Sequence, residues 1–209
     1  MDKAGDKHEF FTKVKKYPSL VEYCKFDITS LPKPFYHDLG QVKAILLGAD
    51  PTNNGVKGNP GLKELDFVFG INSPFEEDFF RLQKANLSDI GLSKDDLYIQ
   101  NVCRNYFIEQ TGGNSHWNQI AEVWLPFLNE ELSILPKQIS VLATAERIMQ
   151  VLVGKIQKAE VMYSMQHPPP LYSEKIGRKV YPLYRHWKYR INRWNGYQNM
   201  LRNEFKGNL

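Results

Sequence analysis

Short apolar runs alternate with longer segments of helical periodicity along most of this chain, and this alternation limits the possible folds. Strand-like runs cover 42–48, 97–102, 139–143 and 161–165, and a short strand or extended loop is expected at 66–71. Strands separated by helices form βαβ units with a parallel sheet and right-handed crossovers. We therefore predict an α/β fold, a three-layer α/β/α sandwich around a short, mostly parallel central sheet.

Helices are expected between and after these runs, at 73–87, 117–132, 145–153 and 190–205. The first begins at a Ser-Pro pair, because proline suits a first helical turn. The second carries apolar residues at helical spacing, and Pro126 is expected to kink it. The third is closed by Gly154, a typical residue after a helix end.

The length and composition favour a single globular domain over 1–209. No apolar stretch approaches the roughly 18 residues of a membrane span, and the charged N-terminus lacks the apolar core of a signal peptide. Cys24 and Cys103 are too few for a disulfide framework or a four-cysteine iron–sulfur cluster. We expect a cytoplasmic protein without membrane contact and, by default, a monomer.

The net charge of +4 is unevenly distributed. From Ser173 onward the chain carries nine basic and two acidic residues, so 173–209 reads as a basic, aromatic-rich C-terminal extension of charge +7. Basic residues interleaved with aromatic ones are typical of proteins that bind the phosphate backbone of nucleic acids. A solvated amphipathic helix with inward-facing aromatic side chains explains the same pattern equally well.

Two ionisable side chains each follow a predicted strand. Asp50 comes after the run 42–48, and His167 comes after the run 161–165. Each has an ordinary explanation alone, because Asp before Pro often begins a turn and His before Pro is often packed. In open α/β sheets, however, ligands bind beyond the carboxyl ends of the strands. A carboxylate and an imidazole at two strand ends therefore indicate an active site.

Four segments strengthen this interpretation through their residues and their order. Segment 48–53 (Gly-Ala-Asp-Pro-Thr-Asn) resembles a Gly-Gln-Asp-Pro-Tyr-His motif, and 68–71 (Val-Phe-Gly-Ile) resembles a segment with a base-stacking phenylalanine. Segment 98–101 (Tyr-Ile-Gln-Asn) resembles a strand ending in a base-reading asparagine, and 167–171 (His-Pro-Pro-Pro-Leu) resembles His-Pro-Ser-Pro-Leu. Together, over roughly residues 40–172, they resemble the uracil-DNA glycosylase superfamily.

The resemblance implies a role for each matched residue. Asp50 would stabilise the positive charge that develops on the sugar and would orient water, and His167 would donate a hydrogen bond to the departing base. Asn101 would read the edge of the base through its amide, and Phe69 would form the floor on which the base stacks. This chemistry requires a nucleotide flipped out of the DNA helix. It requires no cofactor and no metal.

The departures from the family pattern concern substrate and DNA contacts. Thr52 replaces the tyrosine that excludes the thymine methyl group, so a damaged or 5-substituted base could fit. Ala49 replaces glutamine and leaves only its backbone N–H for the base. Leu171 matches the leucine wedge, whereas Pro169 replaces a serine that contacts phosphate. Phosphate contacts are therefore expected from the basic residues near the last motif, Lys175, Arg178, Lys179 and Arg185.

We thus expect a monofunctional DNA glycosylase that hydrolyses the N-glycosidic bond of uracil or a related deaminated or damaged base in base-excision repair. An alternative is a nucleic-acid or nucleobase binding module that kept the fold and lost catalysis, which the replacements at Ala49, Thr52 and Pro169 suggest. A third, weaker alternative is a hydrolase of free nucleosides. Salt-sensitive DNA binding without abasic product would indicate the second, and cleavage of free deoxyuridine alone would indicate the third.

Overall fold

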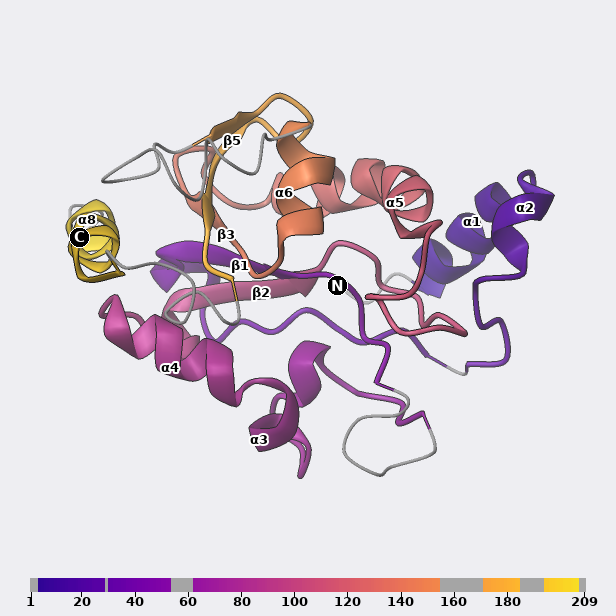
Figure 1. Cartoon of the computed structure of the whole chain (residues 1–209), viewed down its shortest axis with the longest axis horizontal. Helices are drawn as coiled ribbons and strands as arrows, with labels where there is room; N and C mark the ends of the chain where they lie inside the picture. The colour runs from indigo at the N-terminus through magenta and orange to yellow at the C-terminus, as the bar shows by residue number, and fades with distance from the viewer. Residues whose placement is uncertain (1–3, 29, 54–61, 155–170, 185–193, 207–209) are drawn as a thin grey trace.

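A five-stranded, mostly parallel sheet forms the centre of the fold (Figure 1). The computed structural model describes residues 4–28, 30–53, 62–154, 171–184 and 194–206. Its strands are β1 (Ala44–Gly48), β2 (Leu97–Asn101), β3 (Ser140–Ala143), β4 (Leu171–Ser173) and β5 (Arg178–Pro182). Their order across the sheet is β2-β1-β3-β5-β4, and only β4 is antiparallel to its neighbour.

The strands β1, β2 and β3 confirm the strands predicted at 42–48, 97–102 and 139–143. Every residue of these strands is buried, as expected for parallel strands with helices on both faces. The predicted strand at 161–165 lies outside the described residues. Within the described chain, β5 pairs with β3 on the side away from β1. The segment from 173 to 182 is therefore an integral part of the sheet, and the prediction of an appended extension is wrong for these residues.

Helices lie between β1, β2 and β3, whereas β4 and β5 are joined by a turn. The helices are α1 (Ala4–Val14), α2 (Pro18–Val21), α3 (Glu76–Phe79), α4 (Arg81–Asp89), α5 (Trp117–Leu132), α6 (Glu146–Val153) and α8 (Trp194–Lys206), with 3-10 turns η1 (Leu39–Gln41), η2 (Val68–Gly70) and η3 (Lys94–Asp96). The helix expected at 73–87 is divided into α3 and α4, and η2 replaces the extended segment expected at 66–71. Helix α5 covers the predicted range, with Pro126 inside it.

The helices lie on both sides of the sheet. Figure 1 shows α5 and α6 on one side and α3 and α4 on the other. The side chains of Trp117 and Trp124 on α5 are almost completely buried, and the Trp124 ring stacks on Phe10 of α1 with ring centroids 4.2 Å apart. Helix α8 is joined to α4 by a hydrogen bond from Gln198 Nε2 to the Asp89 carbonyl, at 2.5 Å.

Both lateral edges of the sheet are short or covered. At the β2 edge, the Phe35 N–H donates to the Ile99 carbonyl at 2.9 Å, and the Ile99 N–H donates back to the Phe35 carbonyl at 2.8 Å. This pair is an isolated antiparallel bridge. At the other edge, β4 contributes only three residues.

Arg178, at the start of β5, is a structural residue. Its side chain is buried, with only 1% of the residue exposed. The guanidinium donates to the carbonyls of Leu132 (2.7 Å) and Leu135 (2.8 Å), and to those of Pro136 (2.5 Å) and Ile139 (3.0 Å). It therefore ties the connection between α5 and β3 to β5. The prediction that Arg178 contacts DNA is wrong, because the side chain is buried and both of its Nη groups donate to carbonyl oxygens inside the protein.

Among the described helices, none combines the length and the apolar character that crossing a membrane would require.

Candidate functional site at the carboxyl edge of the sheet

The side chains of Asn101 and Phe69 meet above Gly48. Gly48 ends β1 and is paired in register with Asn101, which ends β2. A Cβ atom on Gly48 would lie 2.2 Å from Asn101 Oδ1 and 2.5 Å from Phe69 Cζ. Both distances are far below van der Waals contact, so only glycine permits this arrangement. The structure thus brings together two of the predicted site residues from distant parts of the chain.

The side chain of Asn101 forms no hydrogen bond with the described residues. Only 2% of the residue is exposed. A buried amide normally satisfies both its donor and its acceptor. An Asn101 amide left open at the end of a strand is therefore suited to a ligand that offers one donor and one acceptor.

Phe69 has an unusual backbone conformation. Its φ of 57° and ψ of 16° lie in the left-handed region, which costs a residue other than glycine roughly 1–2 kcal/mol. The ring is half-buried and packs edge-on against Phe80, with centroids 5.7 Å apart. Strain of this kind is often found where a side chain must be held in a functional position. Here it directs the ring over Gly48.

Replacing Gly48 by alanine tests this convergence. The added methyl group must displace the Asn101 amide, the Phe69 ring or both, because each lies within 2.5 Å of its position. Overpacking of this kind costs about 1–3 kcal/mol. We expect Gly48→Ala to lower the free energy of unfolding by that amount, measured by urea denaturation.

Gly40→Ala is the matched control. A Cβ on Gly40 meets only Asp38 Oδ1 at 3.5 Å, an ordinary contact. It should change the free energy of unfolding by less than about 0.5 kcal/mol. Equal effects of the two substitutions would contradict the close approach of Asn101 and Phe69 to Gly48.

The carboxylate of Asp50 lies two residues beyond β1 and accepts three hydrogen bonds. Its Oδ2 accepts from Thr111 Oγ1 at 2.6 Å and from Trp117 Nε1 at 2.9 Å, and its Oδ1 accepts from the Thr52 N–H at 3.0 Å. Trp117 is completely buried at the start of α5. The orientation of the carboxylate is therefore fixed by the loop, by α5 and by the turn that follows β1.

Opposing effects act on the pKa of Asp50. Burial raises this pKa above its ordinary value, whereas the hydrogen bonds from Thr111, Thr52 and Trp117 favour the ionised form and lower it. Burial dominates, so the net shift is upward. A carboxylate with a raised pKa is a better proton acceptor than an exposed one, which suits a group that must activate water.

Arg147 lies next to this carboxylate, in the first turn of α6. Its Nη1 donates to the Thr111 carbonyl, and its Cζ lies 5.2 Å from the centroid of the Trp117 ring. Burial lowers the pKa of Arg147, and the charge of Asp50 raises it in part. Sequence reasoning missed Thr111, Trp117 and Arg147. The one available signal was the general need of a buried tryptophan N–H for an acceptor.

The chain matches no protein family model and no curated protein sequence.

Two other predicted positions beside Asp50 have structural partners. The Thr52 hydroxyl accepts from the Phe107 N–H at 2.9 Å, so this side chain anchors the segment after β2. The Ala49 carbonyl accepts from the Cys103 N–H at 2.9 Å. Asn53, buried next to them, exchanges two hydrogen bonds of 2.7 Å with the backbone of Lys63. These contacts stiffen the loop that presents Asp50.

Other predicted DNA contacts do not gather at this edge. Leu171 packs against the hydrophobic core at the start of β4, where it pairs with Val180. Lys179 lies at the amino end of β5, the sheet edge opposite Asp50, and is 3.5 Å from Glu204. Lys175, in the turn before β5, is paired with Glu122 at 2.5 Å. His167 and Arg185 lie outside the described residues.

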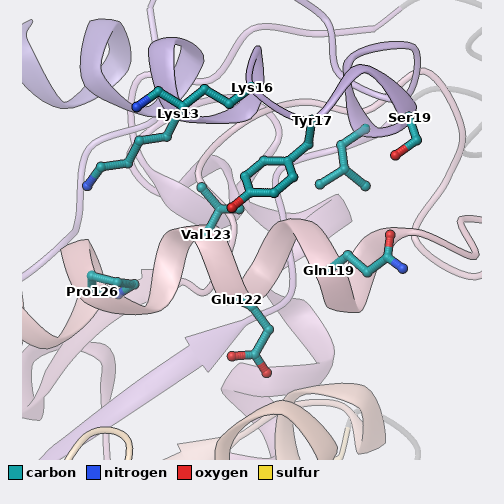
Figure 2. A pocket seen from close by; sticks show the side chains of 9 residues that line it. Lys13, Lys16, Tyr17, Ser19, Gln119, Glu122, Val123 and Pro126 are labelled. Atoms are coloured by element: carbon teal, nitrogen blue, oxygen red, sulfur yellow. The ribbon is translucent and has the colours of Figure 1, made fainter.

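A separate groove lies between the α1–α2 turn and the outer face of α5 (Figure 2). Lys16, Tyr17 and Gln119 are among the residues that line it. The Lys13 ammonium beside it is 2.8 Å from Glu9 and lies over the Phe127 ring. The groove contains none of the residues around Asp50. Within the described ranges, no cluster of three His, Cys, Asp or Glu side chains could hold a metal ion.

Proposed function

We propose that this protein is a monofunctional DNA glycosylase, a divergent member of the uracil-DNA glycosylase superfamily with its three-layer α/β/α fold. The observation that carries the proposal is the convergence of Asn101 and Phe69 over Gly48, with the fixed carboxylate of Asp50 two residues away. An open amide, an aromatic ring and an oriented carboxylate are what recognition and release of a nucleobase require.

The proposed base lies between Phe69 and Asn101. The half-buried phenyl ring offers an apolar surface for stacking. The amide of Asn101 can donate to one carbonyl oxygen of the base and accept from the adjacent N–H. Uracil presents this pair at O4 and N3, and hypoxanthine and xanthine present related pairs. The flipped base thereby satisfies the open Asn101 amide.

The proposed reaction breaks the bond between C1′ of the sugar and the base nitrogen. The electron pair of this bond leaves with the base, and positive charge develops on the sugar. Asp50 stabilises that charge and accepts a proton from the water that adds to C1′. His167, which lies outside the described residues, donates a hydrogen bond to the base as it becomes negative. The fixed donors to Asp50 keep it in place without reorganisation during the reaction.

The test is base release from labelled oligonucleotides that contain uracil, hypoxanthine, xanthine or a thymine mismatch. Each is offered single-stranded and double-stranded, with Asp50→Ala as the inactive control. We expect abasic product from at least one substrate with the wild type and none with the variant. Salt-sensitive binding without product would instead favour a nucleic-acid binding module. Cleavage of free deoxyuridine alone would favour a nucleoside hydrolase.

The pH dependence gives a second prediction. Because burial raises the pKa of Asp50, acidification protonates it at a higher pH than an exposed aspartate. Base release should therefore decline as the pH falls through that raised pKa. Thr111→Val removes a hydrogen bond that favours the carboxylate and should move this decline to higher pH, as measured by single-turnover rates.

Thr12→Val, an exposed substitution on α1, is the control and should leave the pH profile unchanged. The rates of wild type and Thr111→Val should converge at alkaline pH, where Asp50 is ionised in both. Identical acid limbs in the two proteins would refute the role of Thr111 in setting the charge state of Asp50.

A further inference from the structure

We infer that Arg147 binds a backbone phosphate of the nucleotide whose base enters the site. This inference rests on the proposed function and assigns a substrate contact that the sequence motifs did not indicate. Its basis is the position of Arg147 relative to Asn101 and Asp50, and the donors that its guanidinium keeps available.

The order of the strands places three functional groups in a row. Asn101 ends β2, Asp50 follows β1, and Arg147 lies just after β3. Because β2 and β3 flank β1 in a parallel sheet, these groups lie at the same edge, about 4.8 Å apart per strand. A nucleotide has the same order of parts: base, sugar and phosphate. With the base at Asn101 and the sugar at Asp50, its phosphate lies on the β3 side.

The guanidinium of Arg147 is held in position before any ligand binds. It lies over the Trp117 ring, and Nη1 donates to the Thr111 carbonyl. The Trp117 indole and the Thr111 hydroxyl both donate to Asp50 Oδ2. The same two residues therefore orient the carboxylate and the cation. A pre-oriented arginine loses little conformational entropy when it binds an anion.

The described residues leave most donors of Arg147 available. An arginine side chain has five N–H groups, and in the described part of the chain only the bond from Nη1 to Thr111 is formed. No described carboxylate lies within ion-pair distance of this guanidinium, and the residue is partly exposed. The planar fork of arginine matches two phosphate oxygens. Its charge also offsets the repulsion between a phosphate and Asp50.

The experiment combines a protein variant with a neutral phosphate analogue. DNA binding is measured by fluorescence anisotropy for the wild-type chain and Arg147→Gln, with oligonucleotides whose target deoxyuridine carries a 2′-fluoro group. This electron-withdrawing group opposes positive charge on the sugar and so prevents base release during the measurement. In one series each phosphate next to the target nucleotide is replaced in turn by an uncharged methylphosphonate. We expect Arg147→Gln to weaken binding about tenfold and to reduce the slope of log K against log salt by about 1.

The pairing of variant and analogue identifies the contact. At one linkage, the neutral analogue should weaken binding by the wild type and should cause no further loss in Arg147→Gln, because the interaction is already absent. Arg147→Lys keeps the charge but loses the planar fork of donors, so its affinity for DNA should lie between those of the wild type and Arg147→Gln. Lys137→Gln is the control, because it removes the same charge just before the amino end of β3. In this variant, the neutral analogue should weaken DNA binding at every linkage by as much as it does in the wild type.

Equal losses in wild type and Arg147→Gln at every linkage would overturn the inference. So would an unchanged salt slope in a folded Arg147→Gln protein. These binding results do not depend on base release, so they are distinct from a failure of the proposed function, which appears as the absence of abasic product from the wild type.

Discussion

Asp50→Asn is expected to lower the single-turnover rate of base release by a factor of about 10²–10³. The substitution keeps the size of the side chain but removes the negative charge that faces the sugar and the site that accepts the proton of water. The donors Thr111 and Trp117 remain in place. Abasic sites are counted by alkaline strand cleavage of a labelled oligonucleotide.

Asp38→Asn is the matched control, because Asp38 is exposed and lies in the turn before β1, at the opposite edge of the sheet. It should retain the wild-type rate. The Asp50 variant should remain folded and bind DNA, as checked by thermal unfolding and anisotropy. Unchanged base release by a folded Asp50→Asn protein would refute the proposed mechanism.

Arg178→Met is expected to lower the free energy of unfolding by about 3–5 kcal/mol. The substitution keeps much of the apolar stem but removes the donors that serve Leu132, Leu135, Pro136 and Ile139. Leaving a buried carbonyl oxygen without a donor costs about 1–3 kcal/mol, and such costs do not add within one hydrogen-bond network. For a domain of this size the melting temperature should fall by roughly 6–20 °C.

Lys179→Met, at the adjacent position, is the control. The Lys179 side chain is 55% exposed, and its ion pair with Glu204 at 3.5 Å should contribute less than about 1 kcal/mol. Arg178→Lys supplies a measurable intermediate if the methionine variant does not fold, because one ammonium can serve only some of the four carbonyls. Equal stability of Arg178→Met and wild type would contradict the structural role.

The apolar runs were sufficient to predict the central strands. At 42–48, 97–102 and 139–143, the hydrophobic residues mark strands buried on both faces, and β1, β2 and β3 lie within these limits. The same reasoning predicted the range of α5, since its apolar side chains recur with helical spacing. Burial of apolar side chains determines the structure of these segments, so the pattern of apolar residues was enough to predict them.

The hairpin of β4 and β5 could not be predicted in the same way. Its residues include charged ones, and Arg178 reads as a surface cation until its four carbonyl partners are known. The one local signal was Gly177, whose φ of +62° marks the turn. At 66–71, the alternation suggested an extended segment, but the left-handed Phe69 and Gly70 produce a tight turn instead. Tertiary contacts outweighed local preference in both cases.

The site was predictable in its strand-end residues and, through the family resemblance, in Phe69. Asp50 and Asn101 follow directly from the ends of β1 and β2, where the topology brings them to one edge. Their supports could not be found, because Thr111, Trp117 and Arg147 come from a loop and from the beginnings of two helices far away in sequence. No periodicity relates these positions to Asp50. They become visible only through hydrogen bonds in the folded chain.

The two edges of the sheet limit how readily the protein can aggregate at high concentration. An exposed strand edge offers unpaired N–H and C=O groups to a second molecule and promotes aggregation. Here the Phe35 bridge occupies part of the outer side of β2, and β4 is too short to recruit a long strand. The described sheet therefore presents little template for strand addition, and cross-β association should require local unfolding at one of these two edges.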